Sequence, residues 1–224
     1  MKTCYSMALG VLGRLGDAVK HLIPSRLVTC RLGARYRNSV LLTFDDGPDP
    51  IVTPAVLNLL REYGARAVFF IVGRRIERAP GLLLEILEQG HLIGNHSYLH
   101  ANGAQPGFRE YRADLLRCQE AIAGLTRRRP RLFRPPLGRI SPTTVLASQL
   151  VRLKMILWTF DSEDWRCRSC ADAEEAARRT AGEIRARDIV LFHDDNPCVL
   201  RVLDRALPSL KGKGYDLRSA IERV

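Results

Sequence analysis

Short apolar runs alternate with segments of helical periodicity along almost the whole of the 224-residue chain. The runs are rich in β-branched and aromatic residues, which favours buried strands. They cover Val40–Phe44, Ala67–Val72, His91–Gly94, Leu132–Phe133, Met155–Phe160 and Ile189–Phe192, with a weaker seventh near Tyr215–Leu217. Amphipathic segments lie between and after them at Pro54–Tyr63, Leu82–Gln89, Arg109–Leu125, Thr143–Val151, Ala173–Arg185 and Val199–Leu210. This alternation predicts right-handed βαβ units around a mainly parallel sheet, either an open doubly wound sheet or a closed barrel.

Clusters of polar residues directly follow most of the predicted strands. They are Asp45-Asp46-Gly47, Asn95-His96, Arg134-Pro135-Pro136, Asp161 to Trp165 and His193-Asp194. Side chains that converge from the carboxyl ends of many parallel strands are typical of the active-site face of a barrel. We therefore predict an α/β fold in a single domain, a (β/α)7-type barrel of parallel strands.

Two adjacent carboxylates, Asp45 and Asp46, end the first predicted strand. An isolated Asp-Asp-Gly is at least as often a structural turn, because Asp and Gly are common turn residues. Neighbouring carboxylates also repel each other unless a cation or a base holds them. In the catalytic interpretation, one of the two ligates a metal while the other takes a proton from water.

Two histidines, His96 and His100, follow another predicted strand at positions i and i+4. This spacing predicts that both imidazoles lie on one face of a helical turn. Ser97 stands where zinc proteases with a similar histidine pair keep a glutamate base, so the base must come from elsewhere, and Asp45 or Asp46 is available. Two imidazoles and one carboxylate commonly hold a catalytic metal that keeps one position open for water. Zinc is the usual occupant, and cobalt, nickel, manganese and iron are also compatible with these ligands.

Three other strand ends carry charged or aromatic side chains. Arg134 has a permanent charge on a stiff backbone, and we predict that it orients an acidic group by bidentate hydrogen bonds. Trp165 follows three acids and is interpreted either as a core residue or as a platform for a sugar ring. His193 titrates near neutral pH and can deliver a proton to a leaving amine.

Together these motifs resemble the polysaccharide deacetylase family, whose shared region is the NodB homology domain of carbohydrate esterase family 4. The patterns TFDDG, HSxxH, RPPxG, DSxDW and LxHD occur here in the family's order, and the resemblance spans roughly residues 38–217. It implies a distorted (β/α) barrel, a bound divalent metal and the hydrolysis of an N-acetyl group from an amino sugar.

The resemblance also implies a role for each of the site residues. It makes Asp45 the catalytic base, oriented by Arg134, and His193 the general acid, oriented by Asp164. It assigns the metal to Asp46, His96 and His100. It places Trp165 and Leu191 in the walls of the acetyl pocket and completes an oxyanion hole with the backbone N–H of Leu137. The family often has tyrosine at the position of Leu137, so the wall of the sugar site differs here.

Residues 1–37 fall outside the resemblance and form a predicted basic N-terminal arm before a catalytic domain at 38–224. No segment reaches the roughly 20 apolar residues of a membrane-spanning helix, and no clear signal peptide is visible. We therefore expect a cytoplasmic protein, with peripheral membrane contact through the arm as an alternative. The net charge of +11 suits any polyanion, but no nucleic-acid-binding motif accompanies it, so we expect no nucleic-acid partner.

The cysteines are too scattered for a disulfide scaffold in a chain of this length, which fits a reducing compartment. They are Cys4, Cys30, Cys118, Cys167, Cys170 and Cys198. Cys167 and Cys170 form a CxxC pair, but a single pair is a weak signal for zinc or redox chemistry, and an incidental spacing on a loop is favoured.

The predicted function is metal-dependent hydrolysis of the N-acetyl group of an amino sugar in a chitooligosaccharide or a peptidoglycan-like glycan, with release of acetate. One alternative keeps this chemistry but acts on a lipid-linked or nucleotide-linked amino sugar that carries an acetyl or formyl group. Another is a catalytically inactive carbohydrate-binding domain, which the intact set of polar residues disfavours.

Overall fold

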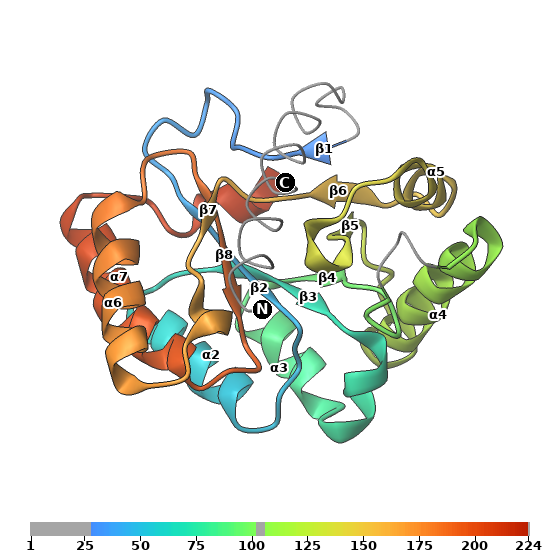
Figure 1. Cartoon of the computed structure of the whole chain (residues 1–224), viewed down its shortest axis with the longest axis horizontal. Helices are drawn as coiled ribbons and strands as arrows, with labels where there is room; N and C mark the ends of the chain where they lie inside the picture. Colours follow the sequence, from blue (N-terminus) through green and yellow to red (C-terminus); the bar gives the residue numbers. More distant parts are fainter. Residues whose placement is uncertain (1–27, 102–105, 224) are drawn as a thin grey trace, which may run out of the picture.

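The computed structural model describes residues 28–101 and 106–223, in which one curved parallel sheet is surrounded by helices (Figure 1). Its strands are β1 (Val28–Thr29), β2 (Leu41–Asp45), β3 (Ala67–Ile71), β4 (Leu92–Asn95), β5 (Leu132–Phe133), β6 (Lys154–Ile156), β7 (Phe160–Asp161) and β8 (Ile189–His193). They are ordered β1-β6-β5-β4-β3-β2-β8-β7, and all neighbours are parallel. Because β1 and β7 both remain edges, the sheet is an open barrel. The predicted α/β barrel class is confirmed.

Within residues 28–101 and 106–223, six α-helices follow the strands and cover the outer face of the sheet (Figure 1). They are α2 (Val52–Glu62), α3 (Gly81–Glu88), α4 (Phe108–Thr126), α5 (Pro142–Leu150), α6 (Cys170–Glu183) and α7 (Cys198–Gly212). Short 3₁₀ turns lie at η1 (Gly73–Arg78), η2 (Pro136–Gly138), η3 (Asp164–Arg166) and η4 (Ser219–Arg223). Each helix overlaps a segment for which the apolar periodicity predicts a helix.

Side chains alternate between the two faces of the sheet, as the two-residue period of a strand requires. Phe44 of β2 stacks on Phe69 of β3 and on Phe192 of β8, with ring centroids 5.0 and 5.4 Å apart, in the core beneath the helices. The residues that alternate with these phenylalanines along the strands face the inside of the barrel. There β2 and β8 pair Leu41 with Ile189, Thr43 with Leu191 and Asp45 with His193. The interior is therefore apolar at the amino end of the strands and becomes polar at the carboxyl end.

The apolar run at Met155–Phe160 is two strands, because the backbone changes partners within it. The N–H of Leu157 donates to the carbonyl of Thr29 on β1, whereas that of Thr159 donates to the carbonyl of Ile189 on β8. The weaker run near Tyr215–Leu217 contributes only a single bridge, between Ser39 and Asp216.

Part of the predicted N-terminal arm lies outside the described residues, which begin at Val28. Val28 and Leu32 are both buried, at 4% and 3% exposure, and they belong to two of the hydrophobic clusters. Among the described helices, none has the length and apolar character needed to cross a bilayer.

Candidate active site

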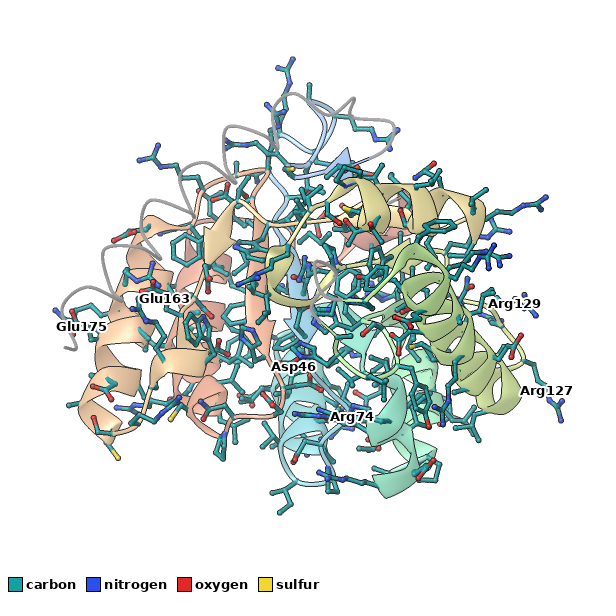
Figure 2. All side chains as sticks on the ribbon, turned by 45° about the vertical axis from the view of Figure 1, so that its right-hand side comes forward. Asp46, Arg74, Arg127, Arg129, Glu163 and Glu175 are labelled. Atoms are coloured by element: carbon teal, nitrogen blue, oxygen red, sulfur yellow. The ribbon has the colours of Figure 1, made fainter. Side chains whose placement is uncertain are left out.

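The polar residues predicted from the sequence meet at the carboxyl ends of the strands. Asp45 is the last residue of β2, His96 follows β4, Arg134 follows β5 and His193 ends β8. Asp164 comes from η3, after the edge strand β7. Figure 2 labels Asp46 near the centre of the molecule, beside the ribbon of β2.

Asp46, His96 and His100 bring three possible ligand atoms together. Each offers one donor atom, and these atoms all lie within 4.8 Å of one another. Asp46 Oδ1 lies 3.0 Å from His100 Nε2 and 3.5 Å from His96 Nε2. This oxygen is buried yet accepts no hydrogen bond from any described residue. A buried carboxylate oxygen without a donor beside two imidazole nitrogens is the donor set that a divalent cation requires, so these residues fit a metal.

The segment that carries the two histidines is a loop, and the predicted helical turn is wrong. Ser97 and His100 both have positive φ, 64° and 56°, which no α-helix contains. His96 is fixed through Nδ1, which lies 2.8 Å from the carbonyl of Arg134, and this leaves Nε2 for the metal. Asp114 of α4 holds the loop by accepting the backbone N–H groups of Tyr98 and Leu99 at 2.8 and 3.0 Å.

Asp114 is therefore a positioning residue that the sequence motifs did not reveal. Asp114→Asn is expected to raise the dissociation constant for Zn²⁺ about 10–100-fold, because one N–H of the histidine loop loses its acceptor. Competition with a chromogenic chelator measures this constant. Glu120→Gln, an exposed change of the same charge on α4, is the control. Equal affinities in the two variants would contradict the role of Asp114.

The acids and histidines of this cluster shift one another's ionisation. Burial alone would raise the pKa of Asp46, but the imidazoles of His100 and His96 outweigh it and hold that pKa far below its usual range. Burial alone would lower the pKa of His96, but Asp45 and Asp46 outweigh it and raise that pKa. The negative charge that produces this second shift also favours a bound cation.

Asp45 is buried and held by the guanidinium of Arg134, which is itself fully buried. Arg134 Nη1 donates to Asp45 Oδ1 and to Thr43 Oγ1, each at 2.8 Å. Its Nε and Nη2 donate to the carbonyls of Ile156 and Leu157. The predicted bidentate pair is therefore wrong, because two of the three nitrogens fix the guanidinium to β6. Asp45 Oδ2 lies on the metal side, 3.6 Å from His96 Nε2.

His193 and Asp164 form a second acid–base pair. His193 Nδ1 lies 2.8 Å from Asp164 Oδ1, and the backbone N–H of His193 donates to Asp164 Oδ2 at 2.8 Å. Burial opposes protonation of this imidazole, but Asp164 and then Asp45 and Asp46 outweigh it and raise the pKa of His193 to about 9. Because Asp45 and His193 are paired across β2 and β8, the two candidate proton carriers face the same space.

Asp194 supports the turn that follows β2. Its carboxylate is fully buried, accepts the hydroxyl of Thr53 at 2.5 Å, and has a pKa that burial raises to about 7. A β-carbon at Gly47 would overlap this carboxylate, which explains why glycine follows the two aspartates. The backbone N–H of Asp194 also donates to the carbonyl of Asp45.

The three residues assigned to substrate binding have very different exposures. Leu137 and Trp165 are 64% and 46% exposed, whereas Leu191 is only 3% exposed and sits one inward-facing position below His193. Leu137 adopts the left-handed conformation, with φ 58° and ψ 16°. Leu137 and Trp165 are therefore free to contact a substrate, whereas Leu191 belongs to the floor of the candidate active site.

The CxxC pair is separate from this cluster. Cys167 is buried, and Cys170 is exposed at the start of α6. Within the described part of the chain, the only group of three metal-binding side chains is Asp46, His96 and His100.

Comparison with known proteins gives the family. A family model described as polysaccharide deacetylase matches residues 33–162, more than half of the chain. The chain belongs to the polysaccharide deacetylase family. A peptidoglycan-N-acetylglucosamine deacetylase of Bacillus cereus is 34% identical over 201 residues, which cover 88% of this chain and 92% of that relative.

Solved structures of this family share the fold. A peptidoglycan N-acetylglucosamine deacetylase in complex with 4-naphthalen-1-yl-N-oxidanyl-benzamide matches with a TM-score of 0.79 and 29% identity, over 87% of this chain and 92% of that one. A pseudoenzyme of the same esterase family from Bacillus anthracis matches with a TM-score of 0.78 and 26% identity, over 87% of this chain and 68% of that one. Because the fold also occurs in a pseudoenzyme, the case for catalysis depends on the site residues.

Proposed function

We propose that the chain hydrolyses the N-acetyl group of an amino sugar in a peptidoglycan-like or chitooligosaccharide glycan and releases acetate. The observation that carries this proposal is the pairing of Asp45 with His193 across two strands, beside the donor set of Asp46, His96 and His100. An acid, a base and a metal site on one face are the components of amide hydrolysis. Family membership and the deacetylase relatives support the same reaction.

In this proposal Asp46, His96 and His100 hold the metal, and Asp45 is the base. A divalent metal bound there supplies a Lewis acid that polarises a carbonyl and lowers the pKa of water. Asp45 takes a proton from the attacking water through Oδ2, while its Oδ1 stays bonded to Arg134. Zinc is our first choice of metal, with cobalt, nickel and manganese as alternatives.

His193 is the proposed general acid. An amide nitrogen leaves poorly unless it receives a proton, and His193 carries that proton on Nε2 while Asp164 holds Nδ1. The backbone N–H of Leu137 is the proposed oxyanion donor, and Trp165 and Leu191 are the proposed walls of the acetyl pocket. Leucine in place of the family's frequent tyrosine removes a phenolic hydroxyl from the wall, so the acceptor sugar meets an apolar surface there.

Released acetate is the direct test of this function. The purified protein, which we expect to carry about one divalent metal per chain, is incubated with chitooligosaccharides, peptidoglycan fragments and lipid-linked or nucleotide-linked amino sugars. We expect acetate from one of the first two classes and its loss after chelation, with recovery when metal is returned. His96→Ala, which removes a proposed ligand, is the negative control.

Three outcomes would count against the proposal in different ways. Full activity in a strong chelator would exclude the metal mechanism. Release of acetate or formate from only the lipid-linked or nucleotide-linked sugars would show that these, and not the glycans, are the substrates. A metal-loaded protein that releases nothing yet binds the glycans would make this chain a carbohydrate-binding member of the family.

A further inference from the structure

A large basic cavity lies at the opposite end of the strands from the candidate active site. It has a volume of 1160 Å³, and its lining includes Leu92 and Leu132, the first residues of β4 and β5. Arg66, directly before β3, and Arg152, shortly before β6, also line it. The metal-binding cluster follows the carboxyl ends of β2 and β4, so the two sites are separated by the length of the sheet.

Five arginines line this cavity, Arg66, Arg128, Arg129, Arg131 and Arg152. Glu222 is the one carboxylate among the described residues of its lining. Figure 2 shows the labelled Arg129 extending outward beyond the C-terminal end of α4, well away from Asp46. Like charges gathered around one hollow repel one another, and an anion placed among them relieves that repulsion.

These guanidinium groups are not satisfied within the described part of the protein. None of the five makes an ion pair or a side-chain hydrogen bond to a described residue, unlike some of the arginines elsewhere. Arg201 and Arg205, for example, both pair with Glu174 on the outer helices. A guanidinium offers five donors in a planar fork that matches phosphate oxygens, so several of them around one cavity favour a phosphate ligand.

The floor of the cavity is mainly apolar. Its buried lining includes Ile93, Ile122, Leu132, Val151 and Ile221, each at most 8% exposed, beside the buried polar residues Gln119 and Thr126. A free phosphate ion would use only the arginines and would leave this floor in contact with water. An arginine rim above an apolar floor instead matches a molecule with an anionic head and an apolar portion.

We propose that this cavity binds the phosphate group of an amphiphilic anion of the phospholipid type, with the arginines on the phosphate and the apolar floor against the first part of the acyl chains. The site is distinct from the sugar site, because the two lie at opposite ends of the barrel. Its occupant is therefore not the acetylated sugar undergoing hydrolysis.

Titration calorimetry with a phospholipid that stays monomeric tests the proposal on the full chain. Dihexanoyl phosphatidylglycerol is expected to bind one molecule per chain. Glycerophosphoglycerol has the same phosphodiester without acyl chains and should bind at least about tenfold more weakly, since each buried methylene contributes about 0.8 kcal/mol, roughly fourfold. Dihexanoyl phosphatidylcholine, with no net charge, is expected to bind at least about tenfold more weakly as well.

Matched charge variants locate the binding. Arg131→Gln/Arg152→Gln removes two rim arginines, whereas Arg112→Gln/Arg178→Gln removes two exposed arginines of α4 and α6 outside the cavity. The rim variant should weaken phosphatidylglycerol binding at least about tenfold, because each lost guanidinium removes charge-assisted hydrogen bonds. The control variant should change it less than about threefold, since distant exposed charges are screened by salt.

Circular dichroism confirms that both double variants are folded, which is expected because all four arginines are exposed. Equal losses in the rim and control variants would overturn the proposal, because binding would then follow the net charge of +11. Glycerophosphoglycerol that binds as tightly as the lipid would also overturn it, by showing that the apolar floor takes no part. Absence of phosphatidylglycerol binding to the unaltered chain would overturn it outright.

Discussion

Replacing Asp45 by asparagine is expected to lower kcat/KM for deacetylation about 10²–10⁴-fold while the protein keeps its metal. Asparagine has nearly the same shape and can still accept from Arg134 through its amide oxygen, but it cannot take a proton from water. The donor set of Asp46, His96 and His100 does not include Asp45, so the metal should remain. Released acetate gives the rate, and elemental analysis of the same sample gives the metal content.

The ligand variants provide the contrast that makes this result informative. Asp46→Asn and His96→Ala should lose both activity and metal, because each removes one of three donors. Metal loss in Asp45→Asn equal to that in Asp46→Asn would show that the roles of the two aspartates have been exchanged. Thermal unfolding must be followed in parallel, because loss of the charge on Asp45 leaves Arg134 buried without a carboxylate, which can cost about 3–5 kcal/mol.

The barrel could be predicted from sequence because its signals are local. A strand that is buried on both faces is apolar throughout, as in Ala67–Ile71, and the helix that follows shows its own period. The partner change within Met155–Phe160 has no such signal, since the run stays largely apolar while the backbone passes from β1 to β8. The two-residue strand Val28–Thr29 was equally hidden, because it is too short to show a period.

The site was predicted residue by residue, but its geometry was not. The i, i+4 spacing of His96 and His100 suggested a helical turn, whereas the contacts of Asp114 stabilise a loop with left-handed residues. Asp114 lies in α4, where its sequence context is that of an ordinary surface acid, so only the tertiary contact identifies it. The sequence around Arg134 does not indicate that two of its guanidinium nitrogens donate to the carbonyls of Ile156 and Leu157.

Asp194 lies in a recognised motif, yet its contacts could not be predicted from the sequence either. The His-Asp pair after β8 is recognised by its histidine, and the sequence alone gives its aspartate no separate role. Its actual contacts are with Thr53 and the turn at Gly47, which come from a different βα unit. Packing between segments that are distant in sequence is therefore the part that residue patterns do not reveal.

The pH dependence of activity provides the second large expected effect. His193 must be protonated to give a proton to the leaving nitrogen, and its pKa is raised to about 9 by Asp164 against the opposing effect of burial. Activity should therefore be present below this pKa and decline as the pH rises through it. A bound divalent cation repels the imidazolium and moves the midpoint of this decline downward from about 9. His193→Ala should lose about 10²–10⁴-fold in rate and retain its metal.

Asp164→Asn tests the cause of that raised pKa. Asparagine removes the negative charge next to His193 Nδ1, so the imidazole loses its proton more easily and the alkaline decline should move to lower pH. The matched control is Asp161→Asn, which removes a nearby charge on β7 that makes no hydrogen bond to His193, and it should shift the decline less. Profiles of kcat/KM against pH for the three proteins, with metal content measured on each, give the comparison. If His193→Ala instead removed the metal, His193 would be a ligand, and Asp161 and Asp194 would be the next acids to test.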